Sequence, residues 1–298
     1  MSAPVQSSNR SPADPWTIRD VLAWATRDFT GRGLESPRLD AELLLGSVLD
    51  LDRVGLIRDA TRPLSNEELS QFRELIKRRR RGEPVAYLLG HREFYGLDFR
   101  VDPRVLIPRP DTETLVETAL EVTQATALSG RHLDLCTGSG CVAIAFAKQR
   151  PTWEVTATDV SQEALGVARE NALRLGTIHN TSFVLGDLFA AVDAETPFDL
   201  VTANPPYISR AEYDSLDAGI RDYEPRLALW GGDDGLDLIR SIARQARRHL
   251  SPGGVLAVEI GYDQGPRAES LLADAGFDEV RIRQDYGRRD RVVSGRRR

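Results

Sequence analysis

The sequence predicts an α/β fold organised around a parallel, doubly wound sheet. From residue 132 onward, short apolar segments alternate with longer segments of helical periodicity. This alternation is typical of a parallel sheet covered by helices on both faces. In addition, two polar motifs, residues 134–140 and 204–207, each follow a predicted strand. Because ligands bind at the carboxyl ends of strands in open α/β sheets, both motifs are expected at a binding site.

The N-terminal part of the chain has a different pattern. Residues 1–15 are polar and rich in proline and serine, without the apolar segment of a signal peptide, so we expect a disordered lead-in. Residues 16 to about 82 show only helical patterns, including an apolar stripe from Ile18 to Phe29 and a capping box at 65–68, and residues 82–90 are expected to form a connector at the end of this domain, 16–90. These patterns predict a small helical bundle.

The last helix of this bundle ends in a basic run, residues 77–81. Cations are favourable at a helix C-terminus because they complement the helix dipole, so the run is consistent with a solvated helix end. Contact with an acidic partner or with RNA is the alternative interpretation.

A linker at 91–110 is expected between the bundle and the α/β region. Residues 93–101 alternate apolar and polar side chains about a glycine, which predicts a β-hairpin. Residues 107–113 contain two prolines and predict a stiff loop. Asp111 or Thr112 is then expected to cap a helix.

The α/β region is expected to extend from residue 111 to residue 298. Its predicted strands alternate with its predicted helices, and the last two strands are expected to close the sheet as a hairpin. The strands are expected at 132–135, 154–158, 182–185, 199–203, 255–260, 280–284 and 291–294. The main helices are expected at 142–148, 162–175, 236–250 and 264–275.

Composition limits the classes of function. The chain has 298 residues and a formal net charge of −6, which argues mildly against a protein that coats nucleic acid. Its two cysteines, Cys136 and Cys141, do not have the spacing of a zinc site, so no metal is expected. Scarce cysteine suits a reducing cytosol. No run of about 18 apolar residues occurs, so no membrane-spanning helix is expected.

The first motif joins the first strand of the sheet to its first helix. Its two glycines allow the backbone to approach a ligand closely. Asp159 ends the next strand, where an acid can accept hydrogen bonds from both hydroxyls of a ribose. Asp187, with Leu188 beside it, follows the third strand and is expected near an adenine ring. The loop residues are Cys136, Thr137, Gly138, Ser139 and Gly140.

These three strand ends together predict a site for a cofactor that contains a nucleoside. The loop lacks the third glycine of the dinucleotide fingerprint, which disfavours a pyrophosphate and favours S-adenosylmethionine. Asp159 and Asp187, each taken alone, are equally consistent with a cap of the helix that follows.

The second motif, residues 204–207, reads Asn-Pro-Pro-Tyr and ends its strand, because two consecutive prolines cannot continue a sheet. The carboxamide oxygen of Asn204 and the carbonyl of Pro205 can accept both hydrogens of one NH2 group. Pro206 stiffens the loop, and Tyr207 offers a flat face for a planar group. The motif therefore predicts a site for a nitrogen attached to a π system. A proline-stiffened loop without chemistry is the alternative.

These features resemble the class I S-adenosylmethionine-dependent methyltransferases, and more closely the HemK/PrmC family. That family methylates the glutamine side chain in the Gly-Gly-Gln motif of peptide chain release factors. The motif at 204–207 alone is shared with adenine-N6 DNA and some guanine-N2 RNA methyltransferases. The Arg-Pro-Asp-Thr-Glu stretch at 109–113 and the N-terminal helical bundle restrict the resemblance to the HemK/PrmC family. Cys136, where the family usually has Gly, and Leu188, where some relatives have an aromatic residue, depart from the pattern. The matching stretches are 82–84, 107–113, 134–140, 204–207, 223–225 and 285–287.

The resemblance implies a seven-stranded Rossmann-like methyltransferase sheet with a small N-terminal helical bundle and a linking β-hairpin. It implies that the bundle recognises the protein substrate and that Asn204, Pro205 and Tyr207 are catalytic. The expected partners are class I release factors, methylated by a cytoplasmic, monomeric enzyme. A nucleic-acid methyltransferase acting on adenine N6 or guanine N2 is the alternative function. The residues expected to bind substrate are Asn204, Pro205, Pro206 and Tyr207, and those expected to bind cofactor are Cys136, Thr137, Gly138, Ser139, Gly140, Asp159, Asp187, Leu188 and Asn204.

Overall fold

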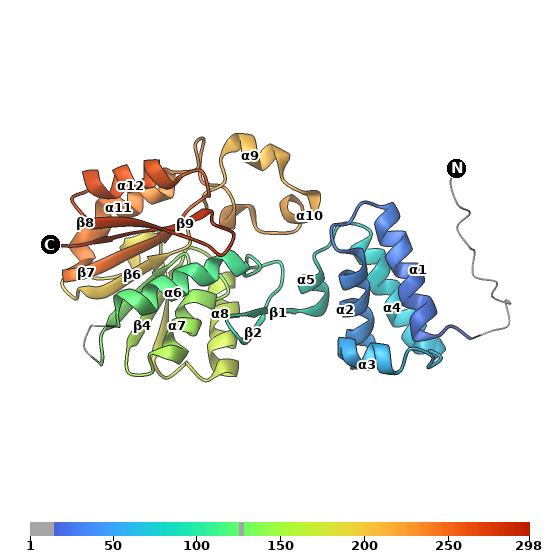
Figure 1. Cartoon of the computed structure of the whole chain (residues 1–298). Coiled ribbons are helices and arrows are strands. Elements are labelled where there is room, and N and C mark those ends of the chain that lie inside the picture. The colour runs from blue at the N-terminus through green and yellow to red at the C-terminus, as the bar shows by residue number, and fades with distance from the viewer. Residues whose placement is uncertain (1–14, 125–127) are drawn as a thin grey trace. The chain divides into compact units, whose positions relative to one another are not determined.

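The computed structural model describes residues 15–124 and 128–298. The lead-in expected at 1–15 lies, apart from its last residue, outside the described residues. The chain divides after Leu89 into two compact units, which are described separately (Figure 1).

The first unit is a bundle of helices around an aliphatic and aromatic core, which confirms the predicted N-terminal helices. Thr17 and Ser65 begin α1 and α4 with capping boxes, so local sequence sets where these helices start. Phe29, Leu44 and Phe72 are among the side chains buried between the helices. The helices are α1 (Ile18–Gly31), α2 (Pro37–Leu49), α3 (Arg53–Arg58), α4 (Asn66–Arg79) and α5 (Val85–Leu89).

Three arginines of the basic run at 77–81 form ion pairs with acids of the same unit. In each pair the guanidinium Nε donates to a carboxylate oxygen at 2.8 Å. These cations therefore hold segments of the bundle together and are not all available to an external partner. The pairs are Arg78 with Glu83, Arg79 with Asp40, and Arg80 with Asp28.

The second unit begins with the predicted β-hairpin, formed by β1 (His91–Phe94) and β2 (Leu97–Arg100). Its turn residues Tyr95 and Gly96 have φ of 53° and 71°, as in the two-residue turns that match the twist of paired strands. The backbone N–H of Tyr95 donates to Glu113 at 3.0 Å, which attaches the hairpin to the helix that follows.

A seven-stranded sheet forms the centre of this unit, in the order β5-β4-β3-β6-β7-β9-β8. The pairs from β5 to β7 are parallel, and β9 runs antiparallel to both of its neighbours. The predicted sheet and its closing hairpin are confirmed. The strands are β3 (Arg131–Leu135), β4 (Glu154–Asp159), β5 (Thr181–Leu185), β6 (Phe198–Ala203), β7 (Leu250–Glu259), β8 (Asp278–Gln284) and β9 (Asp290–Arg296).

Helices cover both faces of the sheet. The first group lies on one face and consists of α6 (Glu113–Val122), α7 (Cys141–Gln149) and α8 (Gln162–Leu175), whereas α11 (Asp237–His249) and α12 (Gly265–Asp274) lie on the other (Figure 1). Short helices lie in the connections: η1 (Pro110–Thr112), η2 (Leu188–Ala191), α9 (Arg210–Ser215), α10 (Ala218–Arg221) and η3 (Arg226–Ala228).

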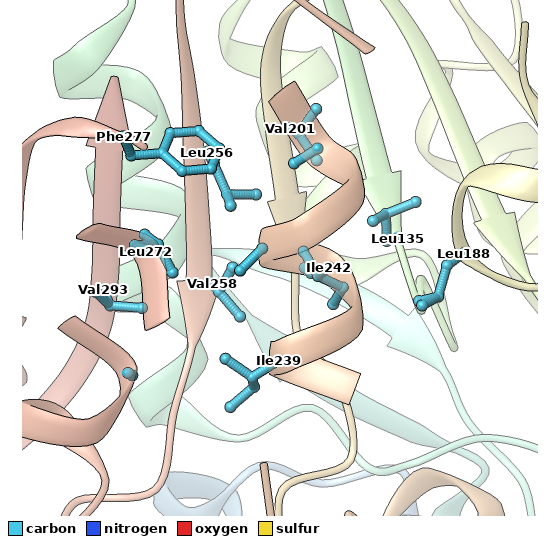
Figure 2. Packing of buried hydrophobic residues seen from close by; sticks show 14 of the residues in the cluster. Leu135, Leu188, Val201, Ile239, Ile242, Leu256, Val258, Leu272, Phe277 and Val293 are labelled. Carbon is cyan, nitrogen blue, oxygen red and sulfur yellow. The ribbon is translucent and has the colours of Figure 1, made fainter. Parts of the chain in front are cut away.

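The larger apolar core lies between the sheet and its second helical layer. Figure 2 shows Ile239 and Ile242 of α11 beside side chains of the strands, among them Val258 and Leu135. These four side chains are fully buried, so α11 packs against β7 and against β3, the strand that carries the first polar motif.

The order of the strands reverses between β3 and β6. The chain builds the sheet outward from β3 through β4 to β5 and then returns to place β6 on the other side of β3. Leu135 pairs with Ala203, the last residue of β6. The two polar motifs therefore leave the sheet next to each other, at the topological switch point where such folds bind ligands.

Candidate functional site

A cavity of about 320 Å³ lies at the carboxyl ends of β3, β4, β5 and β6, a size typical of small-molecule sites. It brings together most of the residues predicted to bind cofactor or substrate. Gly140, Pro205 and Tyr207 adjoin the lining residues in the chain but are not themselves part of the lining. The predicted residues in the lining are Cys136, Thr137, Gly138, Ser139, Asp159, Asp187, Leu188, Asn204 and Pro206.

The glycine loop has an unusual backbone. Cys136, Gly138 and Gly140 have φ of 55°, 55° and 80°, in the left-handed region that favours glycine. A Cβ on Gly140 would lie 2.8 Å from Ile144 Cδ1 and 3.2 Å from Ala168 Cβ, so only glycine allows α7 and α8 to approach here. Cys136 adopts the same region at a cost of about 1–2 kcal/mol. Burial raises the pKa of its thiol, which is therefore neutral.

A buried chain of hydrogen bonds joins the glycine loop to β6. Thr137 Oγ1 donates to Asp134 Oδ2 at 2.6 Å, and Thr202 Oγ1 donates to Asp134 Oδ1 at 2.7 Å. His132 Nε2 lies 2.7 Å from Thr202 Oγ1 and donates to it, because the proton of that hydroxyl is already used. Burial lowers the pKa of His132 to about 3 and raises that of Asp134 to about 6.

Asp159 holds the glycine loop from the next strand. Its carboxylate accepts from Gly138 N and from Ser161 N, each at 2.9 Å. Burial raises the pKa of Asp159, and the two backbone donors oppose that effect. The cap of α8 is Ser161, which accepts from Ala164 N, and Asp187 makes no side-chain cap bond to η2. The helix-cap alternative therefore does not account for either acid.

The Asn-Pro-Pro-Tyr motif is anchored at both ends. Asn204 Nδ2 donates to Thr112 Oγ1 at 3.3 Å, which leaves the amide oxygen Oδ1 as its acceptor. At the other end, Tyr207 Oη donates to Glu259 Oε1 at 3.2 Å, and Gln264 Nε2 donates to the carbonyl of Tyr207 at 2.9 Å. The tyrosine ring is thus tied to the end of β7.

An ion pair connects two segments that line the cavity. Arg109 Nη2 donates to Glu224 Oε1 at 2.5 Å, and Ile107 N donates to Glu224 Oε2 at 3.2 Å. The carboxylate of Glu224 is buried, and its neighbour Pro225 lines the cavity together with Arg109. The pair therefore joins two walls of the cavity.

Sequence reasoning did not identify Thr112, Glu224 or Glu259 as members of the site. Thr112 and Glu224 lie in the stretches 107–113 and 223–225, which carried the family resemblance. Thr112 was expected only as an alternative helix cap, but its side chain makes no cap bond to α6. No role was assigned to Glu224. Glu259 could have been found from its position at the end of an apolar strand, because a carboxylate is seldom fully buried unless it is paired.

Among the described residues, no group of three or more His, Cys, Asp or Glu side chains is arranged to hold a metal ion. In the same part of the chain, no helix has the length and apolar character needed to cross a membrane.

Comparison with known proteins identifies relatives over most of the chain. Residues 20–90 match the PrmC N-terminal domain, and residues 111–220 match the methyltransferase small domain. The release factor glutamine methyltransferase of Geobacter sulfurreducens is 44% identical over 281 residues, covering 94% of this chain and 97% of that protein. The release factor glutamine methyltransferase of Vibrio cholerae is 43% identical, covering 94% and 96%.

The fold recurs in more distant solved structures. A methyltransferase from Pyrococcus furiosus superposes with a TM-score of 0.50 at 21% identity, covering 76% of this chain and 98% of that chain. At this identity the likeness concerns the fold alone.

Proposed function

The chain belongs to the release factor glutamine methyltransferase family, and we propose that it methylates a glutamine side chain of a release factor. The methyl donor is S-adenosylmethionine, and the acceptor is the amide nitrogen, N5, of the glutamine in the Gly-Gly-Gln motif of class I release factors. The observation that carries the proposal is the placement of Asn204. It lines the same cavity as the glycine loop, with its NH2 group bonded to Thr112 and its oxygen left to accept.

The residues of the cavity fit S-adenosylmethionine. Apart from Gly138 itself and its two neighbours in the chain, no described atom lies within 4 Å of the position that a Cβ of Gly138 would take, so the backbone is open to a ligand there. Asp159 would accept hydrogen bonds from the ribose hydroxyls, and Asp187 with Leu188 would lie beside the adenine. When bound, this cofactor supplies an electrophilic methyl group on a sulfonium.

The residues of the second motif act on the substrate amide. An amide nitrogen is a poor nucleophile because its lone pair is delocalised, and positive charge develops on it during methyl transfer. Asn204 Oδ1 and the carbonyl of Pro205 accept its two N–H groups, and these bonds strengthen as the charge grows. They also aim the nitrogen, while Pro206 and Tyr207 stiffen and flank the loop. The surplus proton leaves after transfer, so no general base is needed first.

In this proposal the two parts of the chain have separate functions. The bundle, residues 16–90, recognises the protein substrate, residues 91–110 link the two parts, and residues 111–298 perform methyl transfer, as a monomer in the cytoplasm. A chain shortened to begin at Gly90 should then bind cofactor normally but methylate release factor poorly. Full activity of the shortened chain would give the bundle another role.

The alternative, a nucleic-acid substrate, gains no support from the basic run, because Arg78, Arg79 and Arg80 pair with acids of their own unit. The deciding experiment offers release factor, DNA and RNA together to the enzyme with labelled S-adenosylmethionine. We expect label in the release factor only, and none when its motif glutamine is replaced by alanine. Label in DNA or RNA would overturn the proposal.

A further inference from the structure

Asp134 is an acid of the cavity to which the proposed function gives no role. It is 1% exposed and lines the cavity near the end of β3. In the proposed function, Asp187 lies beside the adenine after β5, and Asp159 meets the ribose after β4. Because β3 is the next strand in the sheet, the amino-acid end of S-adenosylmethionine is expected over β3. That end carries an ammonium group, for which a carboxylate is a suitable partner.

Two hydroxyl groups fix the carboxylate of Asp134. Thr137 Oγ1 donates to its Oδ2 at 2.6 Å, and Thr202 Oγ1 donates to its Oδ1 at 2.7 Å. A carboxylate has about four lone-pair positions, so capacity for a ligand remains. Thr137 lines the cavity itself, whereas Thr202 does not belong to the lining. A side chain that does not touch the cofactor therefore helps to set the direction of one that can.

Thr202 is held in turn by His132. Thr202 pairs with Asp134 across the parallel ladder of β3 and β6, and His132 lies two residues before Asp134, on the same face of β3. His132 Nε2 lies 2.7 Å from Thr202 Oγ1 and donates to it. The His132 ring packs against Phe146, with 4.4 Å between ring centroids. One donor and one acceptor thus fix the rotation of the Thr202 hydroxyl.

Stability alone does not explain a histidine at position 132. Its side chain is fully buried, and its Nδ1 has no hydrogen-bond partner among the described residues. A buried polar atom without a partner costs free energy, whereas an apolar ring could pack against Phe146 without that cost. Local choices that cost stability are expected at functional sites. The donor at Nε2 is the feature that an apolar ring would lack.

We propose that Thr202 and His132 are positioning residues for the cofactor, which direct the carboxylate of Asp134 toward the amino-acid end of S-adenosylmethionine. His132 orients Thr202, and Thr202 orients Asp134. Asn204 follows Thr202 by two residues, so β6 serves the cofactor through one side chain and the substrate through another. This inference rests on the proposed function, because that function supplies the identity of the cofactor.

The test compares Thr202→Val with Thr202→Ser in the binding of two ligands. S-adenosylhomocysteine has the amino-acid end, whereas methylthioadenosine has the nucleoside and the sulfur without it. We expect Thr202→Val to weaken S-adenosylhomocysteine binding by about tenfold, with methylthioadenosine binding unchanged. Thr202→Ser keeps the hydroxyl and should bind both ligands as the wild type does. Unchanged affinities in Thr202→Val, or equal losses for the two ligands, would overturn the inference.

Thr158→Val provides the matched control. Thr158 is a fully buried residue of β4, outside the cavity lining, and its hydroxyl has no partner within the described part of the chain. This variant should bind both ligands as the wild type does. A loss of S-adenosylhomocysteine binding equal to that of Thr202→Val would show that any buried threonine hydroxyl in the sheet has this effect, and would overturn the inference.

His132→Phe tests the second residue and remains informative if Thr202→Val does not fold. It keeps an aromatic ring beside Phe146 but removes the donor to Thr202. We expect a smaller loss of S-adenosylhomocysteine binding than in Thr202→Val, again without loss of methylthioadenosine binding. Unchanged affinity for S-adenosylhomocysteine would remove His132 from the inference.

Kinetics provide an independent readout. In Thr202→Val the KM for S-adenosylmethionine should rise while kcat at saturating cofactor stays near the wild-type value; a lower kcat with unchanged KM would overturn the inference. A wild-type enzyme that binds S-adenosylhomocysteine but leaves release factor unlabelled would overturn the proposed substrate and not this inference. An active wild type with unchanged ligand affinities in Thr202→Val overturns this inference and not the proposed function.

Discussion

Asp28 of the bundle and two buried acids of the α/β unit, Asp134 and Glu259, have opposite environments. In the helical bundle, hydrogen bonds from Arg80 lower the pKa of Asp28, whose side chain is 18% exposed. In the α/β unit, burial raises the pKa of Asp134, which lines the cavity, to about 6 and that of Glu259, which is bonded to Tyr207, to about 7. The bundle pairs Asp28 with an arginine, whereas Asp134 and Glu259 lie in surroundings that disfavour their charge. Strongly raised values at a cavity mark a functional site.

The largest expected effect tests the cavity side of this contrast. Asn204→Ala should lower the methyl-transfer rate by about a hundredfold or more, because it removes an acceptor that stabilises the developing charge. Cofactor affinity should change little. Asn204→Asp should retain more activity than Asn204→Ala, since a carboxylate still accepts hydrogen bonds. Single-turnover rates with release factor measure both, and equal rates for wild type and Asn204→Ala would remove this residue from the mechanism.

The next effect concerns the cofactor. Asp159→Ala should weaken S-adenosylmethionine binding by about tenfold to a hundredfold, as expected for hydrogen bonds to a charged acceptor. Asp28→Ala, which removes an acid of the bundle, is the matched control and should leave that affinity unchanged. Calorimetry measures the affinity of both variants for S-adenosylmethionine. Unchanged binding in Asp159→Ala would mean that the carboxylate serves only Gly138 and Ser161.

A further effect is expected on the pH dependence of stability. The pKa of Glu259 is about 7 in the folded chain and 4.5 ordinarily, so the folded state binds this proton more tightly. The wild type should therefore lose about 3 kcal/mol as pH rises from about 4.5 through 7, relative to Glu259→Gln. Urea unfolding of both proteins at pH 5 and pH 8 isolates this difference. A difference that is the same at both pH values would contradict the assignment.

The smallest effect has the opposite sign and belongs to the bundle. Because the pKa of Asp28 is lowered from 3.8, its contribution to stability is present above that pH and is lost as pH falls through the folded value. Asp28→Asn should reduce the free energy of unfolding at pH 7 by about 1 kcal/mol. The deficit should shrink in acid, and the methylation rate should stay at the wild-type level. If the loss of stability in Asp28→Asn instead grew in acid, the pKa of Asp28 would not be lowered and the difference between the two units would be contradicted.

Local pattern predicted the elements of this fold well, because capping boxes and apolar periodicity act within a few residues. It misplaced the start of β7, expected at 255. Residues 250–254 contain proline and two glycines, yet Leu250 pairs with Phe198 ahead of an irregularity in the ladder. Pairing with a neighbouring strand overrides the local preference there.

The hydrogen-bond partners within the site could not be predicted from local sequence patterns, because they are far apart in the chain. Thr112 and Asn204 are 92 residues apart, and Tyr207 and Glu259 are 52 apart. Likewise, the ion pairs of the basic run could not be predicted from the run itself, because the partner of Arg80, Asp28, lies 52 residues away in the chain. Such contacts arise only once the helices and strands have packed.

The pairing of Leu135 with Ala203 determines which changes in chain length this enzyme tolerates. Adjacent strands lie about 4.8 Å apart, and both motifs leave the sheet at the same level, so backbone hydrogen bonds set the spacing between the glycine loop and Asn204. Apolar residues within β6 can be exchanged without altering that spacing. An insertion or deletion of one residue, however, would turn every later side chain of the strand to the opposite face. We therefore expect the length of this strand to vary less among relatives than its composition.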